Sequence, residues 1–141
     1  TEGADCDQTY MSSVDGVYSC GNALNVFDLV DYVSECAAAA GKNATEYKGA
    51  GESVRIEKGE GLLSFIPHRI DLSKAYDKVV FFFRSAKDMD KATLEFTVDD
   101  KSGFKKKFAF LRPPEMQRLE IDFSAFGLSK DSKITVSLKE N

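Results

Sequence analysis

Apolar and polar residues alternate through much of the second part of the chain. Leu94, Phe96 and Val98, for example, are separated by single polar residues. A period of two residues predicts a strand with one buried face. Residues 79–83 instead form a continuous apolar run, which predicts a strand buried on both faces. About seven strands are predicted in this way, at residues 53–57, 62–66, 79–83, 93–98, 104–110, 119–123 and 134–138.

Turn residues separate these segments, and no helical pattern between them is long enough for a parallel crossover. Residues 99–103 predict a hairpin connection in which Gly103 takes a positive φ. Pro113 and Pro114 interrupt strand pairing and mark a crossing between strands. Short strands with such turns are typical of antiparallel sandwiches and barrels. We therefore assign residues 51–141 to an all-β domain, an antiparallel β-sandwich.

The first part of the chain contains one helical pattern, over residues 26–40. Asn25 is the predicted N-cap, and Gly41 is predicted to end the helix. We expect residues 1–50 to form a loop and helix extension packed on the sandwich, with the helix covering one end or edge. The apolar residues at helical spacing are Val26, Phe27, Leu29, Val30 and Val33.

A four-residue motif occurs twice in the second part. Ile-Asp-Leu-Ser spans residues 70–73, and Ile-Asp-Phe-Ser spans residues 121–124. Each copy ends an extended run and leads into a turn with helical character, where Ser73 and Ser124 are the predicted caps. We interpret the two copies as equivalent loops within one domain and not as a duplicated fold.

Composition and charge argue against two classes of function, nucleic-acid binding and membrane spanning. The chain of 141 residues fits one domain and carries a net charge of −4. We do not expect a nucleic-acid binder, because phosphate affinity needs a surplus of Lys and Arg on one face. We do not expect a membrane span either, because no apolar run approaches the ~20 residues that one needs.

The three cysteines, Cys6, Cys20 and Cys36, all lie in the first part of the chain. We predict one disulfide among them and one remaining thiol. Cys6–Cys20 and Cys20–Cys36 would each close a loop of about 15 residues, and the sequence does not choose between them. The alternative is three thiols in a reducing compartment. We expect no zinc site, because the single histidine, His68, is remote from the cysteines.

No catalytic motif occurs in the chain: it has no nucleophile elbow, no phosphate loop and no cluster of metal ligands, so we do not expect an enzyme. His68 is predicted to lie in a surface loop. Asp5 with Asp7, and Asp99 with Asp100, are pairs of loop acids with the hard oxygen atoms that calcium prefers. Their alternative interpretation is that of solvated turn residues.

A run of three lysines, Lys105 to Lys107, lies within one predicted strand. Charges on an exposed strand protect a sheet edge from pairing with another chain. We interpret the run as such a guard, with an anion or acidic-sugar site as the alternative.

Several stretches resemble the β-sandwich carbohydrate-binding modules of the galactose-binding-like, jelly-roll kind. They are GLLSF at residues 61–65, IDLS at 70–73 leading to YDKVVFFFRS at 76–85, and MQRLEIDFSAFG at 116–127. The resemblance implies a jelly-roll fold and a non-catalytic module of a secreted or cell-surface, often bacterial, protein with other domains on the same chain. It implies no cofactor beyond the structural calcium that many such modules hold.

Polysaccharide or glycan binding is therefore the predicted function. A sugar site combines an aromatic face with planar polar side chains that bond hydroxyl groups. The chain has no Trp, which such modules commonly use, so Tyr76 is the predicted stacking residue. Arg84, Arg112 and Gln117 are its predicted polar partners. The alternative function is a β-sandwich that mediates protein contacts or serves as a spacer in cell-surface assembly, without sugar.

Overall fold

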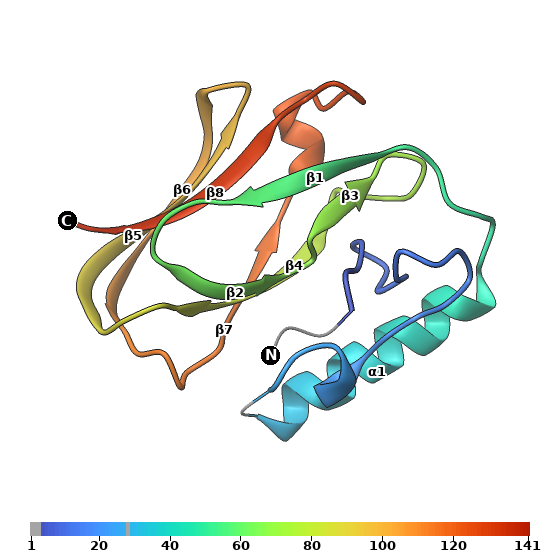
Figure 1. Ribbon diagram of the computed structural model, residues 1–141, viewed down its shortest axis with the longest axis horizontal. Helices are drawn as coiled ribbons and strands as arrows, with labels where there is room; N and C mark the ends of the chain where they lie inside the picture. Colours follow the sequence, from blue (N-terminus) through green and yellow to red (C-terminus); the bar gives the residue numbers. More distant parts are fainter. Residues whose placement is uncertain (1–3, 28) are drawn as a thin grey trace.

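Two packed sheets form the body of the structure (Figure 1). The computed structural model describes residues 4–27 and 29–141. Within these residues, one sheet has five strands in the order β3-β1-β8-β5-β6, and the other has three in the order β2-β4-β7. This confirms the predicted all-β sandwich with an N-terminal helix. The elements are η1 (Gly21–Ala23), α1 (Val30–Thr45), β1 (Ser53–Lys58), β2 (Leu62–Ile66), β3 (Arg69–Asp71), β4 (Val79–Ser85), β5 (Met89–Val98), β6 (Lys101–Leu111), β7 (Gln117–Ile121), η2 (Phe123–Phe126) and β8 (Ile134–Glu140).

Most paired strands are antiparallel, as predicted, but β1 and β8 are parallel, with Ile56 opposite Ile134. The sequence pattern also did not predict β3, which pairs with β1 and places Ile70 opposite Val54. A strand of three residues is too short for a period of two to be visible. Its pairing with β1 depends on contacts between segments, which a local pattern does not show.

Strand β4 is buried on both faces, as its continuous apolar run predicted. Phe81 belongs to the core between the two sheets, where its ring lies 4.9 Å from the ring of Phe96 in β5. Phe82 points to the other side and belongs to a second core under α1, where its ring lies 5.3 Å from that of Phe27. The protein therefore has three layers: the helix with the N-terminal segment, the three-stranded sheet and the five-stranded sheet (Figure 1).

Helix α1 begins and ends later than residues 26–40. Asn25 is not its N-cap: the side chain of Asn25 accepts a hydrogen bond from the adjacent Val26 amide, and Leu29 precedes the helix in extended conformation. Gly41 does not end the helix, which continues to Thr45. No helix among the described residues combines the length and apolar character that a membrane span needs.

The tip of the β5–β6 hairpin differs in detail from the prediction. Asp99 and Asp100 take the positive φ values, of 52° and 66°, and β6 already begins at Lys101. Asp tolerates this conformation better than most residues. Gly103 lies inside β6, where a Cβ would come within 3.3 Å of the Phe126 ring. Close packing against Phe126 therefore explains why residue 103 is a glycine. The turn itself is formed by Asp99 and Asp100.

The repeated motif does form two equivalent turns, but the aspartates are the hydrogen-bond acceptors. Asp71 Oδ1 accepts from the amide of Ser73 at 2.9 Å and from its hydroxyl at 2.6 Å. Asp122 caps η2 and accepts from the amide and hydroxyl of Ser124 in the same way. The serines donate, so their predicted role as caps is corrected.

The disulfide predicted among Cys6, Cys20 and Cys36 is not formed in the structure, where all three are free cysteines. Cys6 and Cys36 are buried and Cys20 is half-buried, all in the apolar core under α1. A free cysteine in such surroundings packs as a small apolar side chain.

The two cores give a testable prediction, with one buried ring taken from each. Replacing Phe82 or Phe96 with Ala should lower the free energy of unfolding by about 3–5 kcal/mol, because each ring is fully enclosed. Urea denaturation measures the change. The control is Phe110→Ala, because Phe110 is 55% exposed and its loss should change stability by less than about 1 kcal/mol. An unchanged midpoint in Phe82→Ala would contradict the three-layer packing.

Candidate functional site

Arg84, one of the predicted sugar ligands, is used inside the structure and is only 8% exposed. One of its guanidinium nitrogens donates to the carbonyl of Pro114 at 2.6 Å and to that of Pro113 at 3.3 Å. Another donates to the carbonyl of Val26. These bonds tie the crossing between β6 and β7 to the segment before α1. Arg84 is therefore a structural anchor.

Gln117 and Arg112 lie on segments next to Arg84, at the end of β4, but Tyr76 lies before the start of that strand. Arg112 lies 3.5 Å from Asp90, with its guanidinium over the Phe110 ring at 5.3 Å. Gln117 begins β7, beside the end of β4. Tyr76 precedes β4 and packs half-buried against the core between the sheets. Most of the length of β4 therefore separates Tyr76 from Gln117, which lies opposite Phe83, at about 3.3 Å per residue. The structure therefore does not bring the four side chains into one site.

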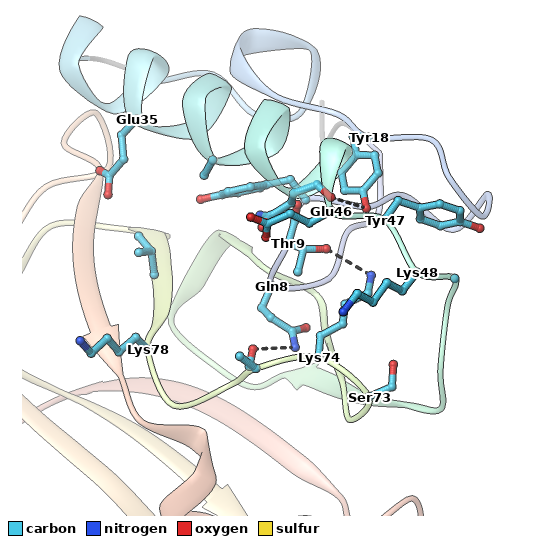
Figure 2. Close-up of a pocket in the computed structure, with 16 residues that line it drawn as sticks. Gln8, Thr9, Tyr18, Glu35, Glu46, Tyr47, Lys48, Ser73, Lys74 and Lys78 are labelled. Atoms are coloured by element: carbon cyan, nitrogen blue, oxygen red, sulfur yellow. Dashed lines mark hydrogen bonds between the residues drawn. The ribbon is translucent and has the colours of Figure 1, made fainter.

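A cleft of about 720 Å³ lies elsewhere, between α1, the N-terminal segment and the loop from β3 to β4 (Figure 2). Glu35, Ala39 and Asn43 of α1 line one wall, because residues four apart share a helix face. The β3–β4 loop and the start of β4 form the opposite wall. Residues 8–10 lie between the walls, and Tyr18 and residues 46–49 complete the lining.

Lys74, in the β3–β4 loop, joins the sandwich to the N-terminal segment. Its Nζ lies 2.7 Å from Asp7 Oδ2, donates to Thr9 Oγ1 at 3.2 Å and lies 3.7 Å from Asp71 Oδ2. Asp7 is 0% exposed, and Asp71 is buried too. Buried carboxylates persist when paired and hydrogen-bonded. The positive charge of Lys74 thus balances two buried carboxylates, those of Asp7 and Asp71.

Asp7 also shapes the tight turn that carries Tyr10 into the cleft. Its Oδ1 accepts from the amides of Thr9 at 2.7 Å and Met11 at 3.2 Å. Tyr10 takes a φ of 69°, an uncommon conformation for a bulky residue. Burial is the main cause that raises the pKa of Tyr10, so its hydroxyl stays protonated and donates to the Cys36 thiol.

Gln8 fixes the segment next to β3. Its side-chain amide bonds the backbone of Asp71 in both directions, with both distances 2.8 Å, and it also donates to the Ala75 carbonyl at 3.2 Å (Figure 2). These hydrogen bonds take the place of the backbone hydrogen bonds that a neighbouring strand would make with β3. The floor of the cleft is therefore held by directional hydrogen bonds.

The helix wall is held at two points. Asn43 Nδ2 donates to the Thr9 carbonyl at 3.1 Å, and the Tyr18 hydroxyl donates to the Asn43 carbonyl at 3.3 Å. Glu35 accepts from Arg118 Nε of β7 at 2.8 Å, and this hydrogen bond is the main cause that raises the pKa of Arg118. The two contacts set the distance of α1 from the sheet.

The accessible groups gather near the C-terminal end of α1 (Figure 2). Tyr47 is 43% exposed, and its hydroxyl shares a hydrogen bond with Asp15, the main cause of its raised pKa. The Tyr47 ring lies against Gly16: a Cβ atom on residue 16 would be 3.7 Å from Cζ of the ring. Glu46 and Lys48 flank it and are exposed. An aromatic face thus lies beside polar groups of both signs.

Asp5 and Asp7, one of the two acidic pairs considered for calcium, have other partners. Asp5 forms ion pairs at 3.1 Å with Arg55 and with Arg69, and Asp7 is bonded to Lys74. No group of three or more His, Cys, Asp or Glu side chains among the described residues is arranged to hold a metal ion. The bonding of these carboxylates therefore does not favour calcium.

His68 was predicted to lie in a surface loop, but it is half-buried between β2 and β3. Its Nδ1 accepts from the Cys6 amide at 3.1 Å and lies 3.3 Å from Asp5 Oδ1. Its backbone amide donates to the Cys6 carbonyl. His68 therefore helps to dock the N-terminal segment.

The lysine run lies on β6, which is an edge strand of the five-stranded sheet. Lys105 lies 3.6 Å from Glu95 of the neighbouring strand, and Lys106 lies over the Phe108 ring. Their position agrees with the predicted protection of a sheet edge.

The residues of the cleft were missed because the sequence of the first 50 residues shows no period outside the helix. One signal was present: four of the five tyrosines, namely Tyr10, Tyr18, Tyr32 and Tyr47, lie in this part of the chain. Tyrosine is enriched where an apolar surface meets polar groups. Their concentration there could have pointed to the N-terminal segment.

The buried pair gives a second prediction. Lys74→Met should lower the free energy of unfolding by about 3 kcal/mol, because it leaves the Asp7 carboxylate buried without a counter-charge. Chemical denaturation of the single variants and of the double variant with Asp7→Asn measures the coupling. The control is Lys78→Met, an exposed lysine of the same cleft, which should change stability by about 0.5 kcal/mol or less. A loss no larger than that of the control would refute the role of the pair.

A third prediction concerns acid stability. Burial acts to raise the pKa of Asp71, but hydrogen bonds from Ser73 and Gly51, together with Lys74, lower it overall below the ordinary 3.8. Asp71 should therefore stabilise the fold above that pH, and the stabilisation should disappear as the pH falls through the folded-state pKa. Asp71→Asn should be less stable than the unaltered protein near neutral pH and should approach it in acid. A difference in stability between the variant and the unaltered protein that stays constant down to the lowest pH would contradict this prediction. The control is the same substitution at an exposed aspartate, Asp122→Asn.

No protein-family model, curated protein or solved structure was found that matches the chain. Its function is therefore inferred from the chemistry of the cleft.

Proposed function

We propose that the protein is a non-catalytic carbohydrate-binding module and that the cleft beside α1 is its sugar site. The observation that carries the proposal is the gathering of Tyr18, Tyr47, Glu46 and Lys48 at one end of this cleft. The cleft volume of about 720 Å³ falls in the range of roughly 300–1,000 Å³ that is usual for small-molecule sites.

The chemistry of a pyranose fits these groups. Its C–H faces pack against an aromatic ring, and its hydroxyl groups both donate and accept. The exposed Tyr47 ring offers such a face, Glu46 accepts from two vicinal hydroxyls, and Lys48 donates. These side chains follow the last turn of α1, which is held by the Asn43 contacts.

The same cleft argues for binding without catalysis. Glycosidases generally use two carboxyl groups across the scissile bond. The acids that line this cleft are Glu35 and Glu46, and Glu35 is already bonded to Arg118. Such a module would act in a secreted or cell-surface protein, as its resemblance to carbohydrate-binding modules implies.

One observation favours protein contacts as a second candidate function. Val26, Leu29 and Val30, around the start of α1, are all exposed. Neighbouring apolar side chains on a surface are typical of sites that contact another protein. This patch lies at the end of α1 away from Tyr47, so the two functions can be tested separately.

The fourth prediction tests the sugar site. Tyr47→Ala and Glu46→Gln should each weaken binding by about 1–3 kcal/mol, the cost of leaving polar groups of a site unpaired or of losing one main contact. Affinity electrophoresis and calorimetry against soluble plant and bacterial polysaccharides measure the effect. Arg112→Gln is the control, because Arg112 lies outside the cleft and should leave affinity unchanged.

Two outcomes would contradict the proposal in different ways. Retardation that survives both cleft variants would place the sugar elsewhere on the molecule. Failure of the unaltered protein to bind any of the polysaccharides would overturn sugar binding and favour the protein-contact function.

A further inference from the structure

Lys74, Asp7 and Asp71 bring an amine and two carboxyl groups together inside the protein. Lys74 Nζ lies 2.7 Å from Asp7 Oδ2 and 3.7 Å from Asp71 Oδ2. Asp7 is 0% exposed and Asp71 is 1% exposed, and the Lys74 side chain is 17% exposed. An amide condensation needs a nucleophile, an electrophile and a group that carries protons between them. The three side chains provide one of each.

The two oxygen atoms of the Asp7 carboxyl group have different surroundings. Oδ1 accepts from the amide and the hydroxyl of Thr9, each at 2.7 Å, and from the amide of Met11 at 3.2 Å. Fixed donors of this kind stabilise the negative charge that develops on a carbonyl oxygen during nucleophilic attack. Oδ2 faces Lys74. Oδ1 is therefore the oxygen that an amide would keep, and Oδ2 is the one that can leave as water.

The amine of Lys74 is held beside the Asp7 carboxyl group. Its Nζ also donates to Thr9 Oγ1 at 3.2 Å and lies 3.7 Å from the Met11 sulfur (Figure 2). Thr9 thus contacts both reacting groups. Two groups held in contact react as if each were present at roughly 10⁵–10⁸ M. Such placement lets an amine and a carboxyl group condense that would stay separate when free in water.

We propose that Lys74 and Asp7 condense into an isopeptide bond, an amide between Nζ and Cγ, with Asp71 as the proton carrier. The bond joins residues that are 67 positions apart in the sequence. It fixes the N-terminal segment covalently to the β3–β4 loop of the sandwich. The inference rests on the geometry of these three side chains and not on the proposed sugar binding.

The condensation balances without an external reagent. One proton moves from Nζ to Asp7 Oδ2 along their hydrogen bond, because burial favours neutral over charged groups. Nζ then attacks Cγ and forms the C–N bond, and the electron pair of the C=O bond moves to Oδ1. Asp71 takes a second proton from Nζ and passes it to the Asp7 hydroxyl group. Water leaves as the electron pair on Oδ1 restores the C=O bond. One ammonium and one carboxylate give one amide and one water, and the Asp71 carboxylate is regenerated.

Mass spectrometry tests the bond directly. The purified full chain is weighed intact in denaturant, where condensation lowers its mass by that of one water molecule. Trypsin then releases residues 1–42, which contain Asp7. It does not cleave after an acylated lysine, so Lys74 stays inside a peptide of residues 70–78. We expect these two peptides to be recovered as one species, joined through Asp7 and Lys74.

Two variants and one internal comparison separate the bond from the ion pair. Lys74→Arg keeps a positive charge beside Asp7, but its guanidinium group stays protonated and does not attack a carboxyl group. This variant should fold and keep the full mass. Asp71→Asn removes the proton carrier, so the linked fraction should fall by about tenfold or more. Circular dichroism confirms that both variants are folded. Lys87 lies 3.3 Å from Glu140, but its side chain is 68% exposed, and we expect it to stay unlinked.

Three outcomes would contradict the proposal. A full intact mass, with cleavage after Lys74, would overturn the bond. An undiminished loss of water in Lys74→Arg would place the dehydration elsewhere in the chain and would overturn it too. A linked fraction in Asp71→Asn equal to that of the unaltered protein would overturn the role of Asp71. The peptide map gives the same answer whether or not the protein binds a polysaccharide, so the two proposals can fail separately.

Discussion

Phe81, Phe82 and Phe83 are consecutive in β4, and each has no exposed surface. Because successive side chains of a strand point to opposite faces, the three-stranded sheet needs an apolar layer on both sides. The five-stranded sheet covers one side, and α1 with the N-terminal segment covers the other. Without that second layer Phe82, Ile66 and Met116 would face water, at roughly 1.5–3 kcal/mol for each side chain. The helix and its preceding segment are therefore part of the fold.

Apolar packing holds this layer on the sheet but does not set its position, because the hydrophobic effect has no direction. Polar contacts do so at three places: Lys74 meets Asp7, Arg118 meets Glu35, and Arg84 binds backbone carbonyls before α1 and after β6. Each joins the first 50 residues to the sandwich. A buried ion pair adds little net stability, but an unpaired buried charge costs a great deal, so such pairs specify one arrangement.

The cleft follows from this arrangement. Polar side chains line the space between α1 and the β3–β4 loop. The inner polar groups, such as Gln8 and Lys74, already bond the protein itself. Glu46, Tyr47 and Lys48 at the end of the helix remain exposed.

The sequence by itself determined the layered β architecture and the two-sided burial of β4, because alternation and apolar runs record which side chains of a strand leave water. It also showed that residues 70–73 and 121–124 form equivalent turns. Tyr76 and Gln117 illustrate what it could not decide: both lie near strand ends, but register places them at opposite ends of the sheet. The cleft depends on contacts such as that of Lys74 with Asp7, which lie 67 residues apart. Local periodicity reports the burial of one segment, whereas the choice of partner between distant segments depends on the path of the whole chain, and only the tertiary structure decides it.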